Sequence, residues 1–233
     1  KPMSYLDYAG EELERQFNPR VAVPDHEAKI GDRAALSAAV RERLECALDV
    51  RYGEGPKETL DIFPAAQADA PVHIYFHGGY WRAGDKADIG FLAEPLVAAG
   101  AAVVLANYDL CPDVTLDEII TQSRRAIAWT YRNIAGHGGD PARITISGSS
   151  AGGHLSAMAL AHDWQSEGLP SDVIKGAVLI TGVYDAEPAR HISVNQELRL
   201  DAEAARRASP VHNLPRRALP LVVAVGGAET EAW

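Results

Sequence analysis

The sequence predicts an α/β fold with a mostly parallel sheet and helices on both of its faces. From about residue 46 onward, short apolar runs alternate with amphipathic segments of helical spacing, which is the pattern of successive strand–helix–strand units. Several runs, such as AAVVLANY at 101–108, are apolar without interruption, as expected of strands that are buried on both faces. Hydrophobic residues make up 47% and charged residues 23% of the 233 residues, so the chain is apolar enough to bury a core of this kind.

Seven segments have the character of strands. Residues 47–53 and 58–64 alternate apolar and polar side chains, which predicts a half-exposed antiparallel pair. The other five are expected to be buried strands, at 71–79, 101–108, 142–148, 174–184 and 218–227.

Helices are predicted where apolar residues recur every three or four positions. These segments lie at 10–17, 33–48, 88–100, 115–138, 151–164 and within 196–210. In the helix at 115–138, Thr115 is the expected N-cap and Glu118 stands where it would complete a capping box, with Gly136 at the end.

The order of these elements predicts one α/β domain over residues 46–233, preceded by a helical arm over 1–45 that would act as a cap. No internal repeat, low-complexity stretch or linker-like segment divides the sequence between them. The arm is expected to cover one end of the sheet.

Composition excludes several classes of partner. The 22 Lys and Arg residues are outnumbered by 32 Asp and Glu, giving a net charge of −10, so nucleic-acid binding is not expected because it requires dense positive charge. No apolar run approaches the roughly 20 residues that span a bilayer, and no signal peptide is visible. Cys46 and Cys111 have neither disulfide-scaffold nor metal-ligand spacing. We therefore expect a cytoplasmic protein with no metal site and no membrane partner.

The segment GSSAGG at 148–153 carries the strongest chemical signal. Among three neighbouring serines, Ser150 alone has a glycine two positions away on both sides. A nucleophilic serine on a strained strand-to-helix turn requires this spacing, because side chains at the flanking positions would clash where the backbone doubles back. The segment follows a predicted strand and precedes a predicted helix, which favours Ser150 as a nucleophile over a glycine-rich turn without chemistry.

A second signal is HGGYW at 77–81, where a predicted strand ends. The carboxyl ends of parallel strands form the ligand crevice of such a sheet. The backbone N–H groups of Gly78 and Gly79, together with that of Ala151, are expected to form an oxyanion hole.

Five motifs occur in a recognisable order. They are HGGYW at 77–81, NYDLCP at 107–112, GSSAGGHL at 148–155, GVYD at 182–185 and SP at 209–210. Together they resemble the kynurenine formamidase (arylformamidase) branch of the hormone-sensitive-lipase-like α/β-hydrolases, from about residue 75 to 233. HGGYW with YDLCP is the more specific pair, since typical esterases of the group resemble HGGG and YRLAPE.

The resemblance implies an α/β-hydrolase fold and a serine hydrolase that needs no cofactor. Ser150 would attack the carbonyl of a small-molecule ester or N-formyl amide, N-formylkynurenine being the favoured type, to give an acyl-enzyme. The acid of the triad should follow the strand at 218–227. Glu229 is the first carboxylate there, and Glu231 and Asp185 remain as rivals.

Two aromatic residues follow the oxyanion glycines. Tyr80 stands where related esterases often have a third glycine, so it is expected to narrow the acyl side of the site. Trp81 is expected to floor an aromatic substrate pocket, and a core tryptophan is the equal alternative.

The general base is the missing member of this set. In this fold a histidine follows the acid along the chain, and no histidine follows Glu229. The eight histidines are His26, His73, His77, His137, His154, His162, His191 and His212. None is a convincing base, so we expect the chain to be truncated at its C-terminus, with the catalytic histidine, a strand and a helix beyond Trp233.

Two alternatives remain at this stage. A short-chain carboxylesterase would use the same machinery with a different pocket. A hydrolase-fold binding protein without catalysis would explain the missing histidine. A homodimer and a monomer are both compatible with the sequence.

Overall fold

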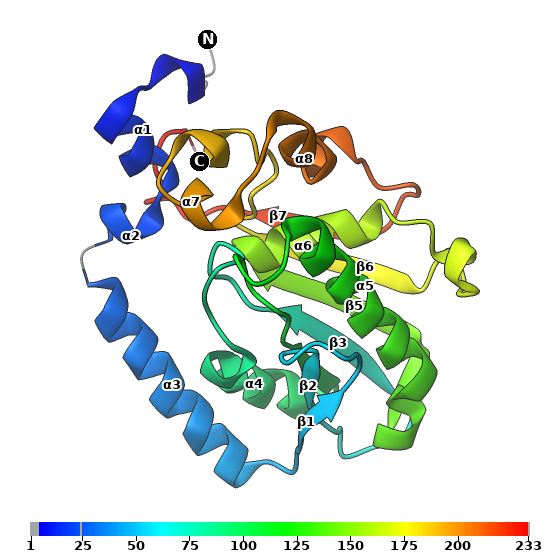
Figure 1. The fold of residues 1–233 in the computed structure, drawn as a ribbon. Helices are drawn as coiled ribbons and strands as arrows, with labels where there is room; N and C mark the ends of the chain where they lie inside the picture. Colours follow the sequence, from blue (N-terminus) through cyan, green and yellow to red (C-terminus); the bar gives the residue numbers. More distant parts are fainter. Residues whose placement is uncertain (1–4, 24, 233) are drawn as a thin grey trace.

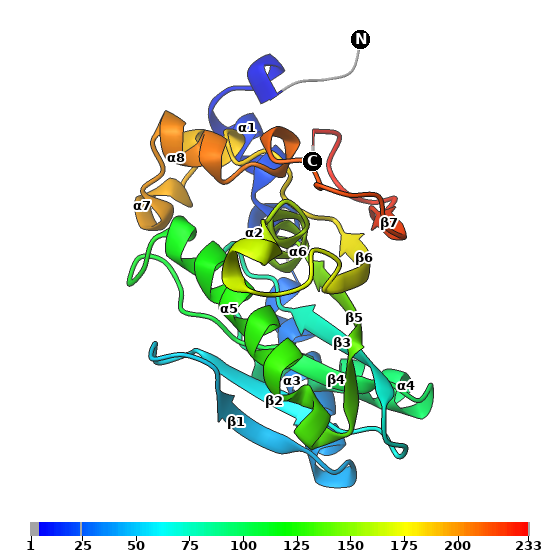
Figure 2. The same ribbon diagram turned by 90° about the vertical axis from the view of Figure 1, so that its right-hand side faces the viewer.

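The computed structural model describes residues 5–23 and 25–232, apart from the side chains of Ala22, His26 and Ile30. Within that part of the chain, seven strands form one sheet in the order β1-β2-β4-β3-β5-β6-β7 (Figure 2). The strands are β1 (Ala47–Arg51), β2 (Thr59–Phe63), β3 (Ala70–Phe76), β4 (Ala102–Ala106), β5 (Gly139–Ser149), β6 (Ile174–Ile180) and β7 (Leu221–Ala224). The β1–β2 and β2–β4 pairs are antiparallel and the remaining four are parallel, which confirms the predicted mostly parallel α/β sheet.

Helices and 3-10 turns (η) connect the strands (Figure 1). The N-terminal arm holds η1 (Tyr5–Asp7), α1 (Gly10–Phe17), α2 (Pro19–Ala22) and α3 (His26–Arg43). The central helices are η2 (Lys86–Leu92), α4 (Ala93–Ala98), α5 (Leu116–Asn133), η3 (Ile134–His137), α6 (Ala151–Leu160) and η4 (Trp164–Glu167). Between β6 and β7 lie η5 (Pro188–His191), α7 (Asn195–Leu198), α8 (Ala202–Arg207) and η6 (Pro210–His212).

Both faces of the central strands are buried. In β4, Val104 belongs to the cluster on the face covered by α5 and α6, while Val103 and Leu105 belong to the cluster on the face of α3 and α4. Figure 2 shows α5 and α4 on opposite sides of the sheet. Because alternate side chains of a strand point to opposite faces, burial of both faces requires the uninterrupted apolar sequence seen there.

Several predicted helices have different bounds, among them the two that precede β1 and β4. The helix expected over 33–48 ends at Arg43, since residues from Ala47 onward pair with β2 as a strand. The helix expected over 88–100 is divided into η2 and α4. At Gly90 in η2, an added Cβ would lie 3.2 Å from atoms of Ser37 and Arg41, which belong to α3. The lack of a side chain at Gly90 therefore allows η2 to pack closely against α3.

The ends of α5 agree only in part with the predicted caps. The Thr115 hydroxyl accepts the N–H of Glu118, as an N-cap does. The Glu118 carboxylate pairs with Arg125 two turns on, at 2.6 Å, and no reciprocal capping-box bond is formed among the described residues. The left-handed residue that ends the segment is Gly138, with φ 79°, two positions after the predicted Gly136.

Strand β7 is exposed, although its sequence predicts a buried strand. Leu221, Val222 and Val223 are 42%, 56% and 59% exposed. The strand lies at the edge of the sheet, where its hydrogen bonds go to β6 on one side only, and no helix of the described residues covers it. The apolar sequence of a strand shows that its side chains are suited to burial. Whether they are buried depends on the elements that pack over the strand.

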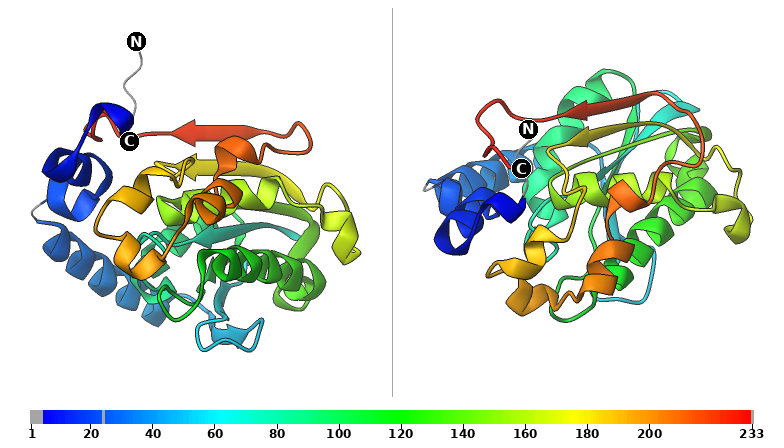
Figure 3. Two further views of the ribbon diagram at one scale, coloured as in Figure 1. Left: turned by 45° about the horizontal axis from the view of Figure 1, so that its top comes forward. Right: turned by 90° about the horizontal axis from the view of Figure 1, so that it is seen from above.

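The N-terminal arm runs beside the segment that follows β7. Figure 3 shows the blue α1 next to the red end of the chain, residues 214 and more apart in sequence. Leu13 and Phe17 of α1 are buried in the main core cluster. The arm is therefore packed onto the α/β domain at the end of the sheet where β7 terminates.

Candidate active site

Ser150 occupies a strained turn between β5 and α6. Its φ of 55° and ψ of −117° lie outside the conformations that residues with a side chain prefer, at a cost of about 1–3 kcal/mol. Its N–H donates to the carbonyl O of Ile180 at 2.9 Å, and its own carbonyl accepts the N–H of His154 at 3.0 Å. Such strain is concentrated at functional sites.

The flanking glycines are required by close backbone contacts. A Cβ at Gly148 would lie 2.2 Å from the carbonyl C of Gly152, and a Cβ at Gly152 would lie 1.9 Å from the carbonyl O of Phe76. Neither neighbour is a flexible side chain that could move away. The geometry supports the register that the glycine spacing predicts, with Ser150 at the turn.

The turn after β3 lies directly against this serine. A Cβ at Gly78 would be 3.4 Å from Cβ of Ser150. Gly79 has φ 127°, and a Cβ there would lie 2.0 Å from the carbonyl O of Ala83. Ala151 is the first residue of α6, so its N–H has no acceptor within the helix. The structure thus brings together the three predicted oxyanion donors and Ser150.

Tyr108 and Cys111 brace the oxyanion turn, a role that the sequence did not reveal. The Tyr108 hydroxyl donates to the carbonyl O of His77 at 2.7 Å, and its ring stacks on the imidazole at 4.2 Å. The N–H of Cys111 donates to the carbonyl O of Trp81 at 2.8 Å. Both residues come from the motif NYDLCP, which in the sequence alone indicates the family resemblance but not this bracing.

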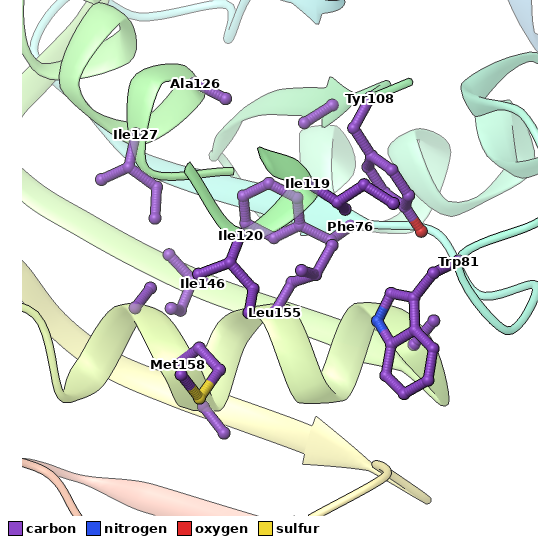
Figure 4. Close-up of a cluster of buried hydrophobic side chains, with 14 of the residues drawn as sticks. Phe76, Trp81, Tyr108, Ile119, Ile120, Ala126, Ile127, Ile146, Leu155 and Met158 are labelled. Atoms are coloured by element: carbon purple, nitrogen blue, oxygen red, sulfur yellow. The ribbon is translucent and has the colours of Figure 1, made fainter. Parts of the chain in front are cut away.

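Trp81 lies in the core and not on a pocket wall. It has no exposed surface, and its indole packs beside α6 among Leu155 and its neighbours (Figure 4). Its N–H donates to Nδ1 of His154 at 3.1 Å. Of the two alternatives stated for Trp81, a pocket floor and a core tryptophan, the structure shows the core position, because the polar atom and the ring are both satisfied inside the protein.

Tyr80 is buried beside the N-terminal arm. It is 7% exposed, and its φ of 52° is left-handed. Burial, and after it the nearby Glu14 carboxylate of α1, raises the pKa of the Tyr80 phenol. The expected bulk next to Gly79 is therefore present, and α1 lies against it.

The three candidate acids have different surroundings. Glu229 is exposed in the turn after β7, with its carboxylate beside Gly226. Asp185 accepts the N–H of Glu187 at 2.9 Å and lies 3.4 Å from the Ser209 hydroxyl, so it braces its own loop. Glu231 faces the arm, where desolvation and this carboxylate raise the pKa of the Tyr8 phenol.

The described histidine side chains are engaged elsewhere. His154 donates from Nε2 to the carbonyl O of Ala208 at 2.6 Å, and His73 contacts the hydroxyls of Thr145 and Ser147. Burial lowers the pKa of His73, His77 and His154 to about 4, which keeps all three neutral at pH 7. His162 contacts Glu167, and His191 contacts Glu187. The ring of His137 lies beside that of Trp129, and His212 is exposed. Among the side chains that the structure describes, none of these imidazoles hydrogen-bonds to Ser150.

A cavity of about 520 Å³ lies away from these residues. It is lined by residues that include Ile174, Trp164 and Arg216. Ile174 begins β6, whereas Ser150 follows the end of the parallel strand β5, so the cavity and Ser150 are at opposite ends of the sheet. Ligands of such sheets bind at the carboxyl ends of strands, and we assign the site to Ser150 and not to the cavity.

Residues 5–23 and 25–232 contain neither a metal-binding cluster nor a helix that could span a membrane. In that part of the chain no three His, Cys, Asp or Glu side chains gather into a group that could hold a metal ion. None of its helices combines the length and apolar character needed to cross a bilayer.

Known proteins share this sequence and fold. A model of the α/β-hydrolase fold family matches residues 73–219. A kynurenine formamidase from Danio rerio is 38% identical over 211 residues, which cover 86% of this chain and 69% of that protein. Esterase LipC from Mycobacterium tuberculosis is 35% identical over 76% of this chain and 49% of its own length. A crystal structure from Silicibacter sp., assigned as a thioesterase, superposes with a TM-score of 0.84 at 32% identity, covering 95% of this chain and 82% of the other. These matches confirm the predicted fold and the likeness to kynurenine formamidases.

Proposed function

The chain belongs to the α/β-hydrolase fold family, and from this we propose that it is a serine hydrolase of the kynurenine formamidase type, which cleaves N-formyl arylamines through an acyl-enzyme. The observation that carries the proposal is the contact between two turns. Ser150, in its strained conformation at the start of α6, has Gly78 against its Cβ. A nucleophile and a glycine turn in contact are what acyl transfer with oxyanion stabilisation requires.

The proposed reaction has two steps. The Ser150 hydroxyl attacks the formyl carbon while a base takes its proton, and the negative oxygen is held by the N–H groups of Gly78, Gly79 and Ala151. The tetrahedral intermediate collapses, the C–N bond breaks, and the base returns the proton to the leaving arylamine. Water then attacks the formyl-enzyme in the same way, releasing formate and free Ser150.

Glu229 is the proposed acid. The proposed base is a histidine whose side chain is not among those that the structure describes. Glu229 stands after β7, where the acid of this fold is placed, and its carboxylate is exposed. Asp185 is already bonded within its own loop, and Glu231 stands two residues further along the chain than Glu229. A carboxylate beside the imidazole fixes its tautomer and stabilises its charged form.

A short-chain carboxylesterase is the second candidate. It uses the same nucleophile and oxyanion donors and differs only in the acyl pocket, and esterase LipC is among the relatives. The buried ring of Tyr80 next to Gly79 favours the smallest acyl group, because it fills space into which an acyl chain would extend. Because the formyl group is the smallest acyl group, it is the one that the Tyr80 side chain hinders least.

Mutation and labelling of the full-length protein test the proposal. Ser150→Ala should abolish hydrolysis of N-formylkynurenine and reaction with a fluorophosphonate probe, whereas Ser149→Ala should retain substantial activity. Peptide mapping should place the label on Ser150. Labelling of Ser149 or Ser147, or full activity of Ser150→Ala, would refute it.

A further inference from the structure

Helix α1 is wedged between two segments of the α/β domain. Glu14 and Gln16 are two positions apart, which is about 200° around a helix, so they face nearly opposite directions. The Glu14 carboxylate accepts the N–H of Ser193 at 2.8 Å and its hydroxyl at 2.5 Å, from the segment between β6 and β7. The other side of α1 faces the loop after β7 (Figure 3).

Gln16 is the residue that joins α1 to that loop. Its backbone carbonyl accepts the Thr230 hydroxyl at 2.5 Å, and its side-chain Oε1 accepts the N–H of Ala232 at 3.1 Å. Its Nε2 donates to Glu12 at 2.8 Å, which fixes the orientation of the amide. The side chain is buried, with 3% of the residue exposed. The carbonyl lies in the last turn of α1, where helical carbonyls lack an internal donor, so Thr230 satisfies a group that would otherwise be unpaired.

These are the hydrogen bonds that hold residues 229–232 to the rest of the described chain. Within the loop itself, the N–H of Glu229 donates to the carbonyl O of Gly226 at 3.1 Å. The preceding strand β7 is an exposed edge strand, and within the loop Ala232 is partly buried and packs against the main core cluster. The two hydrogen bonds to Gln16 therefore join both neighbours of this stretch, Thr230 and Ala232, to α1 and help to fix the position of Glu229.

We propose that Gln16 is a positioning residue for the catalytic acid: through Thr230 and Ala232 it holds the loop on which Glu229 orients the catalytic imidazole. The role rests on the proposed function, since it requires Glu229 to be the acid. It gives the N-terminal arm a part in catalysis although the arm contributes no reacting group.

Two variants of the full-length enzyme remove the bonds one at a time. Gln16→Ala removes the bond to Ala232, and Thr230→Val removes the bond to the Gln16 carbonyl with little change of shape. Thr230→Ser keeps the hydroxyl, and Glu11→Ala alters an exposed residue of the same helix. With N-formylkynurenine, Gln16→Ala and Thr230→Val should each lower kcat roughly tenfold with little change in KM, while Thr230→Ser and Glu11→Ala should match the wild type.

The pH profile separates positioning from general loss of structure. A carboxylate beside an imidazole raises its pKa, so a displaced Glu229 lets the pKa of the base fall. The acidic limb of kcat/KM should then move to lower pH in Gln16→Ala, in Thr230→Val and in Glu229→Gln alike. Loss of activity without this movement would show a structural role only and would overturn the inference.

Glu229→Gln distinguishes this inference from the proposed function. If Glu229→Gln is impaired and adding Thr230→Val costs little more, the two residues act as one unit and the positioning role stands. If Glu229→Gln is impaired while Gln16→Ala and Thr230→Val behave as wild type, the positioning role is refuted and the acid assignment survives. If Glu229→Gln retains wild-type activity, the acid assignment itself is refuted.

Discussion

The indole N–H of Trp81 donates to Nδ1 of His154 across 3.1 Å, and the same imidazole donates from Nε2 to the carbonyl O of Ala208 at 2.6 Å. Trp81 belongs to the turn that carries the oxyanion glycines, and His154 lies one helical turn after Ser150. The imidazole is thus a fixed neutral link between the oxyanion turn, the nucleophile helix and the segment before β7. Its partners determine its tautomer, with the proton on Nε2.

Trp81→Ala should destabilise the protein. Removal of a buried indole costs about 3–5 kcal/mol, and Nδ1 of His154 loses its donor. Trp81→Phe keeps part of the ring volume and should cost about 1–3 kcal/mol, mainly for the unpaired acceptor. Free energies of unfolding in urea measure both changes. A selective loss of affinity for aryl substrates in Trp81→Phe, at unchanged stability, would show that Trp81 lines the substrate pocket after all.

The strands, their order of appearance and the serine turn were predictable because local rules determine them. Glycine two positions either side of Ser150 is a requirement of backbone packing that any occupant of such a turn must meet. The antiparallel β1 and β2 have an alternating pattern that distinguishes them from the apolar runs of the central parallel strands. The predicted half exposure holds for β1 only, because β2 lies between β1 and β4 and is buried along its length. These features can be read from short windows of sequence.

The features that were missed depend on residues far apart in the chain. Trp81 is a core residue because His154, 73 positions away, accepts its N–H, and no local pattern distinguishes that from a place in a pocket. The contact of Gln16 with Thr230 spans 214 positions. The exposure of β7 depends on what packs over it, which its own apolar sequence does not report.

Gly152→Ala should disrupt the serine turn. The new Cβ would meet the carbonyl O of Phe76 at 1.9 Å, and overpacking against backbone costs roughly 1–3 kcal/mol or more. We expect a lower midpoint of thermal unfolding and loss of fluorophosphonate labelling. Gly136→Ala is the matched control, since its Cβ would have nothing within 4 Å. Equal stability of the two variants would contradict the packing argument.

Stability should fall as the pH drops from about 6.5 towards 4. Burial lowers the pKa of His73, His77 and His154 to about 4, so over this range the unfolded chain binds protons that the folded protein does not. Each histidine then removes at most about 1.4 kcal/mol of stability per pH unit. His154→Gln should be less stable than the wild type at pH 7 and should show a shallower loss between pH 6.5 and 4. Denaturant unfolding at a series of pH values measures the slope, and an unchanged slope would show that His154 is not held neutral.

Acyl-chain preference should depend on Tyr80. Tyr80 follows the oxyanion glycines and its ring is buried. Its backbone has the left-handed conformation, which glycine adopts without cost. In a p-nitrophenyl ester series, kcat/KM should fall about 10-fold or more from acetyl to octanoyl, with N-formylkynurenine hydrolysed alongside. Tyr80→Gly opens the acyl side and relieves the backbone, so it should flatten this decline, whereas Tyr80→Phe keeps the bulk and should retain it. An optimum at butanoyl or longer in the wild type, with no turnover of N-formylkynurenine, would reject the formamidase proposal and leave the carboxylesterase.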